Sequence, residues 1–477
     1  MPRDSNSWKP AILLSAASLS LYAIGAQKVL HGYDVFQLMR WIDQDAVHPR
    51  HPGYLALVGL LRCLSRSMGF SAHQTLLAAS AIGASLAVGL AHRFALALGA
   101  SPARAACASA TCALTASWFH FATVAEMHAV FLPFAAASLW AMASHLRTGR
   151  EAPLLLAFAA SGTAACVHAT GHLLVPLLLS LSCWRVTGCH APPKAALRAL
   201  ARAPLHAAIW GILSLLLMRS GRTLSTEGAV GFLERAGDPA GALLGIPGSV
   251  LRELLVPFAP TSAAVLLLLF HAAWRRVALL LLGAALCYAL ATAWLLRGGL
   301  VEHGAYALPL LPPAAVLLAL ALRPRTLSAM LVATALFGSC WVFIPRLRTS
   351  RAPVDEHLGR ALAAAQREMG ARILLGDLRE YDSALVADPL ADVRCIEFEA
   401  ALLPEGRFPD GPVAVSWLAW EASRAGSEGR RFLVSDSACA FLRSRCPGFD
   451  FAWREQKTVE KRRVERPWLE GWEISPR

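Results

Sequence analysis

Long apolar stretches fill most of residues 1–345 and restrict what this chain can fold into more than any other feature. A helix that crosses a bilayer needs about 20 mostly apolar residues, within a range of roughly 17–25. About eleven stretches come near this length, at residues 11–27, 72–95, 105–123, 127–145, 153–167, 172–185, 204–218, 261–274, 277–296, 306–322 and 326–344. Of the whole sequence, 56% is hydrophobic and 16% is charged, whereas soluble domains have roughly 45–50% apolar and 25% charged residues. The sequence therefore predicts a polytopic α-helical membrane protein.

The stretch 52–69 is apolar at its start but contains Arg62 and Arg66. Its apolar part is too short to cross a bilayer, so we expect an amphipathic helix on the membrane surface. With this placement the basic clusters between the apolar stretches all face one side, which the positive-inside rule identifies as the cytoplasm. These clusters are Arg3/Lys9, Arg93/Arg104, Arg147/Arg150, Arg185/Lys194/Arg198/Arg202, Arg275/Arg276 and Arg323/Arg325.

The basic residues thus indicate topology, and the formal net charge of +13 does not predict nucleic-acid binding. We expect the N-terminus in the cytoplasm and the C-terminus outside it. The stretch 11–27 has one alternative interpretation as a signal peptide, because basic residues precede it and small residues end it.

The composition changes at Arg346, after which helix-like and strand-like segments alternate. The helix-like segments are 355–369 and 416–425, the strand-like ones are 372–375, 394–398 and 431–434, and the charged segment 455–466 is typical of a solvated strand or hairpin. We therefore expect two domains: a membrane domain at 1–345 with outer loops 28–71 and 219–260, and a small extracytoplasmic α/β domain at 346–477.

The C-terminal domain contains Cys395, Cys439 and Cys446. Outside the cytoplasm these residues would permit one disulfide and leave one thiol over. Two roles for the domain remain open: it stabilises the outer loops, or it recognises a second substrate.

Acidic residues and histidines gather on the predicted outer side of the membrane, and arginines gather on the inner side. The outer set comprises Asp34, Asp43, Asp45, His48 and His51 in the first loop, Glu126 and His128, His168 and His172, and Arg297, Glu302 and His303 in the last loop. Ionisable groups at membrane segments are costly and are candidates for a functional site. The alternative is that these loops are simply polar. Glu126 weighs against this, because it begins an apolar stretch without a basic residue nearby in sequence.

The first outer loop contains Gly32-Tyr33-Asp34 and then His48-Pro49-Arg50-His51-Pro52-Gly53-Tyr54. This pattern resembles the first outer loop of GT-C glycosyltransferases, which use polyprenyl-phosphate sugars, and it is most similar to the protein O-mannosyltransferase-like branch. The segment 118–130, with Ala125-Glu126-Met127-His128, resembles an aromatic-rich turn of that branch. The segment from Glu302 through Tyr306 to Pro312 is similar to the last outer loop of such enzymes.

Two departures from the family pattern affect the assignment of site residues. Family members have a second acidic residue close behind the first-loop aspartate, whereas Val35-Phe36-Gln37 follows Asp34 here. Asp43 or Asp45 could take that place, so the carboxylate that matters stays open. His128 stands where the family has a tyrosine.

The resemblance implies transfer of a monosaccharide from a polyprenyl-phosphate donor to a protein, lipid or glycan acceptor outside a bacterial inner membrane. Asp34 would be the base for the acceptor hydroxyl in a single displacement that inverts the sugar, with Glu126 as a second catalytic carboxylate. The expected substrate-binding residues are His48, His51, Tyr54, His128, His172, Arg297, Glu302, His303 and Tyr306.

Arg297 and His303 could hold the departing phosphate through charge-assisted hydrogen bonds, and Arg219, Arg222 and Arg252 are weaker candidates. Each arginine could instead anchor the chain to lipid headgroups. Carboxylates and imidazoles also suit a divalent metal ion, so a metal held by Asp34, Glu126 and a histidine is an alternative, although the spacing of these residues does not specify one. The loop 219–260 is either a lid with a short amphipathic helix or a passive connector.

Two other classes of function compete with a transferase. A transporter or flippase for lipid-linked glycans would place ionisable residues near the bilayer midplane and often contains structural repeats. The sequence shows no repeat and keeps its charges at helix ends, which favours an enzyme. A non-catalytic membrane scaffold with an outer binding domain is the third alternative.

Overall fold

The structure, a computed structural model, describes residues 7–27, 35, 38–39, 41–42, 46–47, 51–184, 194–220, 222–223, 247–248, 250–295, 304–343, 356–376, 380–381, 383–384, 388, 391–396, 408, 410–466 and 469–476. The chain divides into two compact units. The first comprises Met1–Gln27, Gln44–Phe70 and Gln74–Thr349, and we call it the helical unit. The second comprises Lys28–Asp43, Ser71–His73 and Ser350–Arg477, and we call it the C-terminal unit.

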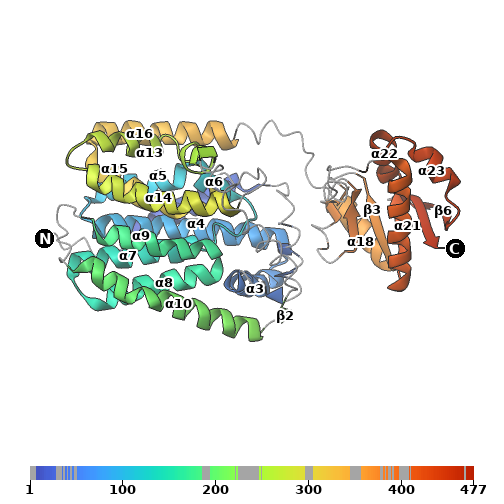
Figure 1. The fold of residues 1–477 in the computed structure, drawn as a ribbon, viewed down its shortest axis with the longest axis horizontal. Helices are drawn as coiled ribbons and strands as arrows, with labels where there is room; N and C mark the ends of the chain where they lie inside the picture. Colours follow the sequence, from blue (N-terminus) through green and yellow to red (C-terminus); the bar gives the residue numbers. More distant parts are fainter. Residues whose placement is uncertain are drawn as a thin grey trace. The chain divides into compact units, whose positions relative to one another are not determined.

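Helices occupy every apolar stretch predicted from the sequence, and they lie side by side along the helical unit (Figure 1). The α-helices are α1 Lys9–Gly25, α3 Pro52–Ser67, α4 Ala72–Ala97, α5 Pro102–Leu114, α6 Ala116–Thr123, α7 Leu132–Thr148, α8 Glu151–Val167, α9 Leu174–Ser182, α10 Ala195–Ser220, α13 Thr261–Leu267, α14 Arg275–Leu295, α15 Leu311–Ala321 and α16 Pro324–Gly338. Short 3-10 helices are η2 Ala169–Leu173, η4 Leu268–Phe270 and η5 Ala305–Leu310, and π-helical turns are η3 Val250–Leu255 and η6 Ser339–Phe343.

Four helical segments are long and apolar enough to cross a membrane by length and composition, within the described residues: Ala72–Ala97, Ala195–Arg219, Arg275–Ala293 and Pro324–Val342. The other apolar helices are shorter. The predicted number of spans therefore stays a prediction, whereas the mainly helical architecture is confirmed.

Two predicted helices are interrupted or shortened in the structure. The stretch 105–123 is divided at Thr115, whose backbone is extended and whose Oγ1 donates a hydrogen bond of 2.6 Å to the carbonyl of Thr111. The stretch 127–145 becomes helical only at Leu132, where Pro133 suits the first turn of α7. Glu126 therefore lies in a non-helical turn before α7, and the expectation that it begins the helix is wrong.

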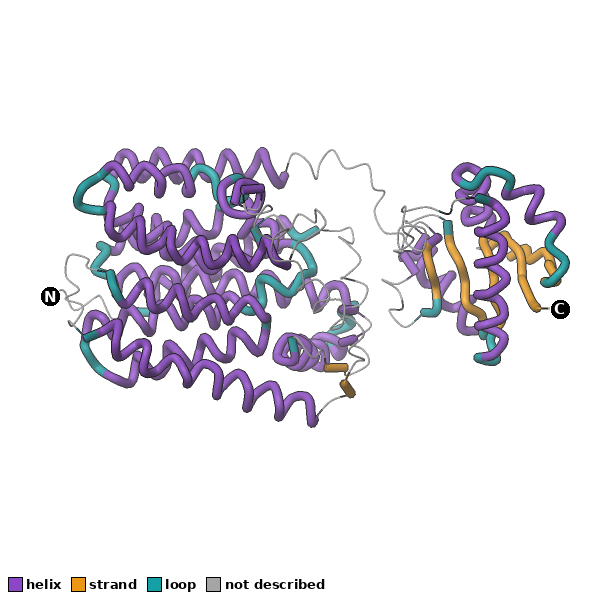
Figure 2. Tube along the Cα trace, viewed as in Figure 1, coloured by secondary structure: helices purple, strands orange, loops and turns teal. Residues whose placement is uncertain are grey.

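Helix α3 runs across the ends of the other helices, since the view that shows α7 to α10 from the side shows α3 nearly end-on (Figure 2). One side of α3 is buried through Tyr54, Leu55 and Val58. Its other side exposes large apolar residues, namely Leu57, Leu60, Leu64 and Met68. An apolar face exposed in this way favours the predicted position on a membrane surface.

The C-terminal unit contains a five-stranded sheet in the order β4-β3-β5-β7-β6. Its strands are β3 Ala371–Leu375, β4 Val393–Cys395, β5 Arg431–Ser435, β6 Val459–Arg466 and β7 Leu469–Pro476, and its helices are α18 Glu356–Met369, α21 Gly411–Ser427, α22 Asp436–Arg445 and α23 Phe449–Glu455. Strands β4, β3 and β5 are parallel, whereas β7 pairs antiparallel with β5 and with β6. The predicted helix and strand segments are thus found close to their expected positions, and the charged segment forms the first strand of a hairpin.

The core of this unit forms where α21 packs on the sheet, with Leu418 and Ala422 of the helix against Leu374, Phe432 and Val434 of the strands. The three cysteines Cys395, Cys439 and Cys446 are buried as free thiols. The disulfide that the sequence would permit is therefore not formed. Burial raises the pKa of the Cys439 thiol to about 11, with smaller contributions from neighbouring charges.

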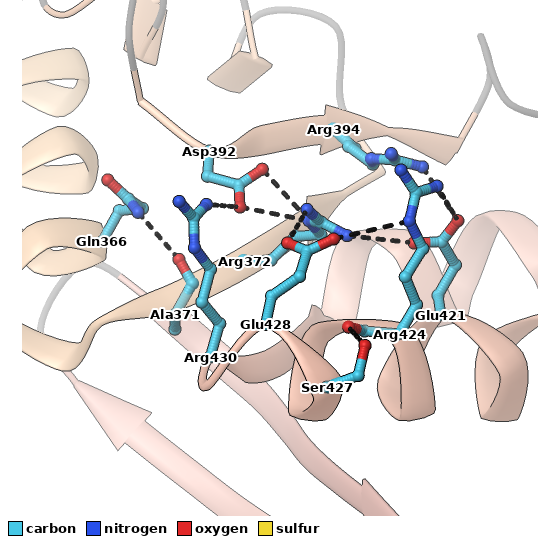
Figure 3. Close-up of polar contacts among 10 residues, drawn as sticks. All are labelled: Gln366, Ala371, Arg372, Asp392, Arg394, Glu421, Arg424, Ser427, Glu428 and Arg430. Atoms are coloured by element: carbon cyan, nitrogen blue, oxygen red, sulfur yellow. Dashed lines mark hydrogen bonds and ion pairs between the residues drawn. The ribbon is translucent and has the colours of Figure 1, made fainter.

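A buried arginine connects the strands to the end of α21 (Figure 3). Arg372 bonds both oxygens of Asp392 at 3.1 Å, Glu428 at 2.9 Å and Glu421 at 3.5 Å. Glu421 also accepts a 3.0 Å bond from Arg394. The side chains of Arg372 and Glu421 are only 7% and 1% exposed. Because an uncompensated charge at such burial is very costly, these ion pairs, which we call the Arg372 network, fix how the helix sits on the sheet.

Candidate functional site

Residues from four separate segments meet at one end of the helical unit. His51 precedes α3, Glu126 and His128 lie in the turn between α6 and α7, His168 lies between α8 and η2, and Tyr306 lies in η5. We call His51, His128 and His168 the histidine cluster. The sequence placed all of these segments on one face, and the structure brings their side chains into contact.

His168 is buried at the centre of this arrangement. Its ring stacks on that of His51, with centroids 4.5 Å apart and planes 9° apart, and it meets the ring of His128 at 4.6 Å and 51°. Phe131 stacks near it at 5.4 Å, and Tyr306 approaches His128 edge-on at 5.3 Å. The cluster is therefore a packed set of flat rings.

The first turn of η2 fixes two of these imidazoles. The backbone N–H of Thr170 donates to Nδ1 of His168 at 3.3 Å, and the N–H of Ala169 donates to Nδ1 of His51 at 3.3 Å. The hydroxyl of Thr170 lies 2.7 Å from the same Nδ1 of His168. Since the first N–H groups of a helix lack partners within it, His168 acts as the N-cap of η2.

Glu126 supplies a carboxylate at the edge of the cluster. Its Oε2 accepts a 2.8 Å hydrogen bond from the N–H of Met127 and lies 3.3 Å from Nδ1 of His128. Its backbone carbonyl accepts a 3.0 Å hydrogen bond from Ser80 of α4. The side chains of Glu126 and His128 are 17% and 6% exposed, so the charge of Glu126 is only partly hydrated.

Tyr54 lies beneath this group on the buried side of α3. Among the residues that the structure describes, its hydroxyl has no hydrogen-bond partner. Burial raises its pKa well above the ordinary value, and the charge of Glu126 raises that pKa further. The phenol is therefore a neutral donor close to the carboxylate.

His172 takes part in a different set of contacts, although it is only one turn of helix beyond His168. Its Nδ1 lies 2.9 Å from Nε2 of His206 in α10, and Nδ1 of His206 lies 2.8 Å from the hydroxyl of Ser161 in α8. The structure thus turns His172 toward α10 and does not bring it into the histidine cluster.

Several residues selected from the sequence lie outside the described part of the chain. They are Asp34, Asp43, Asp45, His48, Arg297, Glu302 and His303. Their roles stay predictions. Among the described residues there is no group of three or more His, Cys, Asp or Glu side chains that could hold a metal ion.

The loop 219–260 contains Glu253, which sequence analysis did not select. Glu253 is 3% exposed, and its Oε2 accepts a 2.7 Å hydrogen bond from the N–H of Gly304. The available signal was an acidic residue, next to Arg252, within the mainly apolar η3 segment Val250–Leu255. The loop is therefore attached to the segment that carries Tyr306, and its residues Arg222–Thr223 form a short parallel bridge with Ala46–Val47 of the first loop.

An apolar cavity of about 290 Å³ begins next to this attachment. It is lined by residues of η3, α13, α14, η5 and α15, including Leu254, Phe258, Val265, Leu281, Leu286 and Leu310. A Cβ atom on Gly304 would lie 2.9 Å from the ring of Phe258, so one wall of the cavity touches the segment before Tyr306. A cavity of this composition suits a hydrocarbon chain.

Comparison with known proteins gives a match at the level of structure alone. No family model and no curated protein matches the chain. The structure resembles ArnT from Cupriavidus metallidurans in the apo state, with a TM-score of 0.55 and 14% identity, and ArnT bound to undecaprenyl phosphate, with a TM-score of 0.53 and 12% identity. Each match covers 97% of both chains.

An oligosaccharyltransferase from Archaeoglobus fulgidus, in complex with Zn and sulfate, aligns with a TM-score of 0.49 and 13% identity, over 97% of this chain and 72% of that one. The two ArnT structures match the chain over nearly its whole length. They show that the chain shares its fold with ArnT, whereas membership of the GT-C glycosyltransferases and of the O-mannosyltransferase-like branch stays a prediction. The chain thus shares the fold of the two ArnT structures, and its described part contains helices that are long and apolar enough to cross a membrane.

Proposed function

We propose that this protein is a membrane glycosyltransferase that moves a monosaccharide from a polyprenyl-phosphate donor to a protein, lipid or glycan acceptor. The observation that carries the proposal is the meeting of the Glu126 carboxylate with three imidazoles and Tyr306, brought together from four segments at one end of the helical unit. The related fold of ArnT, which has been seen with undecaprenyl phosphate, supports a polyprenyl-linked donor.

The reaction joins the oxygen of an acceptor hydroxyl to the anomeric carbon and breaks the bond between that carbon and the phosphate oxygen. The acceptor proton passes to Asp34, and polyprenyl phosphate leaves with the bonding electrons. General base catalysis of this kind contributes about 10²–10⁴-fold to the rate. Glu126 orients His128 and adds negative charge where positive charge develops on the sugar, which lowers the barrier.

The apolar cavity beside η5 provides a place for part of the polyprenyl chain. Burial of apolar surface there favours binding by about 25 cal/mol per Å². Arg297 and His303 follow α14, the helix that lines this cavity, in sequence. We assign them the departing phosphate, with Glu302 in the same loop and His48 in the first loop as further substrate ligands.

A donor-cleavage assay tests the proposal. Purified protein is incubated with radiolabelled polyprenyl-phosphate hexoses, and free polyprenyl phosphate is measured. A transporter or a scaffold releases none, whereas a transferase does. Asp34→Asn abolishes release while the protein still inserts into the membrane, and Asp43→Asn and Asp45→Asn test the two alternative carboxylates of the same loop. An active, normally folded Asp34→Asn protein would remove Asp34 as the base.

A site on the outer face requires a definite orientation of the chain in the membrane. We propose a bacterial inner membrane, with the N-terminus in the cytoplasm and the C-terminal unit outside it. A reporter that is active only outside the cytoplasm is active after Arg477 and inactive after Arg276. The opposite pattern would place the site on the cytoplasmic side.

Deleting the chain from Pro353 onward separates the two roles of the C-terminal unit. If the unit recognises the acceptor, the shortened enzyme still hydrolyses donor slowly but loses acceptor affinity, because remote contacts of a bound substrate provide orientation. If the unit stabilises the loops, thermal stability falls while acceptor affinity is kept. Unchanged stability together with unchanged transfer would exclude both roles.

A further inference from the structure

We propose that Glu253 is a positioning residue, which holds Tyr306 against His128 and thereby sets how tightly the donor binds. This inference rests on the proposed glycosyltransferase function and extends it to a residue outside the histidine cluster. Glu253 lies in η3, within the loop 219–260, and acts through its hydrogen bond to Gly304.

The turn before η5 is held on both sides of Gly304. Its N–H donates a 2.7 Å hydrogen bond to Oε2 of Glu253. Its carbonyl accepts the first hydrogen bond of η5, at 3.0 Å, from the N–H of Ala307. Because Tyr306 lies only two residues beyond Gly304, a shift of this turn moves the ring of Tyr306.

The ring of Tyr306 meets two members of the histidine cluster. Its centroid lies 5.3 Å from that of His128, with the planes at 89°, and 6.2 Å from that of His168. Edge-on contacts between rings are favourable only over a limited range of distance and angle. The contact therefore requires η5 to keep a fixed distance from the turn that contains His128.

The segment that carries Glu253 is itself attached to α6, the helix that precedes the turn with His128. The N–H of Ser117, in the first turn of α6, donates a 3.3 Å hydrogen bond to the carbonyl of Pro257. First-turn N–H groups have no partner within their own helix, so a carbonyl from another segment can accept from them. The chain from η3 to Pro257 thus connects α6 to Gly304, and Glu253 is the side chain that completes the connection.

The burial of Glu253 supports this role. Glu253 is only 3% exposed, in a segment whose residues Leu254, Leu255 and Phe258 line the apolar cavity. A buried carboxylate loses its hydration, which costs free energy unless hydrogen bonds replace the water. An apolar residue would avoid this cost but could not accept the N–H of Gly304. We therefore attribute the acidic residue to the position that it imposes on η5 and not to a gain in stability.

Three substitutions separate the acceptor oxygen of Glu253 from its size and its charge. Glu253→Gln keeps an oxygen at the same reach and removes the charge. Glu253→Leu removes the acceptor and leaves an apolar side chain. Glu253→Asp keeps the charge but shortens the side chain by one methylene, and it decides the question if the leucine variant does not fold. Leu251→Ala, at an exposed position of the same turn, is the matched control.

The experiment measures KM and kcat for the release of polyprenyl phosphate from a polyprenyl-phosphate hexose, and the thermal midpoint of the full-length protein. Loss of an interaction that binds substrate and transition state equally raises KM and leaves kcat unchanged. We expect Glu253→Leu to raise KM roughly 3- to 10-fold, the net effect of one hydrogen bond, at unchanged kcat. Glu253→Gln should stay near the wild type, Glu253→Asp should fall between the two, and Leu251→Ala should match the wild type.

A double-mutant cycle tests whether Glu253 acts through Tyr306. Tyr306→Leu removes the ring that contacts His128 and should itself raise KM. If the two residues act as one unit, Glu253→Leu adds little in the Tyr306→Leu background, whereas independent residues multiply their effects. Hydrogen exchange in η5 should become faster in Glu253→Leu and stay unchanged in Glu253→Gln, because only the leucine variant lacks the acceptor.

Each contrary result has a distinct meaning. Glu253→Leu with a wild-type KM, or with a loss of kcat alone, would reduce Glu253 to a structural role and overturn the inference while the transferase function stands. Multiplied effects in the double variant, or a KM in Glu253→Gln as high as in Glu253→Asp, would also overturn it. A wild-type protein that cleaves no polyprenyl-phosphate hexose would overturn the transferase function and this inference together.

Discussion

The histidine cluster and the Arg372 network are two ways of burying polar groups in one chain. The cluster joins imidazole rings by stacking and by 3.3 Å hydrogen bonds from backbone N–H groups, with one carboxylate at its edge. The network consists of ion pairs between fully charged groups, in which the single guanidinium of Arg372 contacts three carboxylates. Neutral hydrogen bonds contribute about 0.5–1.5 kcal/mol each and can be exchanged for a ligand, whereas breaking a buried ion pair costs about 3–5 kcal/mol. The weaker arrangement suits a site, and the stronger one suits a scaffold.

The largest effect should come from the Arg372 network. Replacing Arg372 by Met leaves Asp392, Glu421 and Glu428 without their shared partner, and should lower the free energy of unfolding of the C-terminal unit by about 3–5 kcal/mol. Hydrogen exchange in peptides from β3 and α21 measures the change. The control is Arg424→Met, because Arg424 pairs with two of the same carboxylates but is 45% exposed, so its loss should cost less than about 1 kcal/mol. Equal losses of protection in both variants would contradict the importance of the buried pairs.

Removing the charge in the histidine cluster should affect activity instead of stability. Glu126→Gln keeps an oxygen for the Met127 N–H but loses the charge beside His128, and kcat should fall roughly 100-fold, which corresponds to about 2.7 kcal/mol. Glu151→Gln, which removes an exposed carboxylate paired with Arg202, should retain normal turnover. If Glu126→Gln unfolds the protein as strongly as Arg372→Met does and leaves the turnover of the folded fraction intact, the distinction between site and scaffold fails.

A smaller loss of stability is expected from a substitution at Gly304, where the chain turns just before Tyr306. Gly304 has a φ of +83°, and an added Cβ would lie 3.1 Å from the carbonyl oxygen of Glu253. Gly304→Ala should therefore cost about 1–2 kcal/mol, seen as faster hydrogen exchange in η5 and a lower thermal midpoint. Gly283→Ala in α14, where a Cβ meets nothing within 4 Å, should be neutral or stabilising by up to about 1 kcal/mol. Equal effects of the two substitutions would show that the positive φ is unimportant.

The smallest effect concerns the exposed ion pair of Arg431 with Glu473. The hydrogen bond from Arg431, opposed in part by burial, holds the pKa of Glu473 below its ordinary value of 4.5. A carboxyl whose pKa is lower in the folded state stabilises the fold above its unfolded pKa, and this contribution is lost as the pH falls through the folded value. Since Arg431 is 45% exposed, the loss below pH 4.5 should be under about 1 kcal/mol. Arg431→Gln should flatten the acid side of the stability profile of the C-terminal unit, and an unchanged profile would contradict this.

The sequence predicted the helices and strands because regular secondary structure follows from local patterns of apolar and polar residues. Apolar stretches located the helices, and short β-branched or aliphatic segments located β3, β4 and β5. It did not locate the break at Thr115, where a side-chain bond to Thr111 and an extended backbone end α5. Such a break depends on tertiary packing, which apolar composition does not encode.

The sequence predicted only part of the site, because contacts between distant segments are not visible in local patterns. Glu126, His51, His128 and Tyr306 were selected from motifs, and the structure brings them together around His168. Tyr54, also selected, is buried and lies within the electrostatic influence of Glu126. His168 and His172 were grouped because both fall at the same predicted outer turn. In the structure His168 caps a 3-10 helix that begins after it, so the two imidazoles diverge. Glu253 was missed because its partner is a backbone N–H 51 positions away.

The bond from Ala169 to His51 has a consequence for the order of events during synthesis. The two residues are 118 positions apart in sequence. At about 5–20 residues per second, the ribosome completes this interval in roughly 6–24 s. During that time His51 lacks the backbone group that orients its ring, although α3 has already been made. A nascent chain that ends before α8 is complete therefore lacks both His168 and the backbone group that orients His51, so the histidine cluster can form only after α8 has been made.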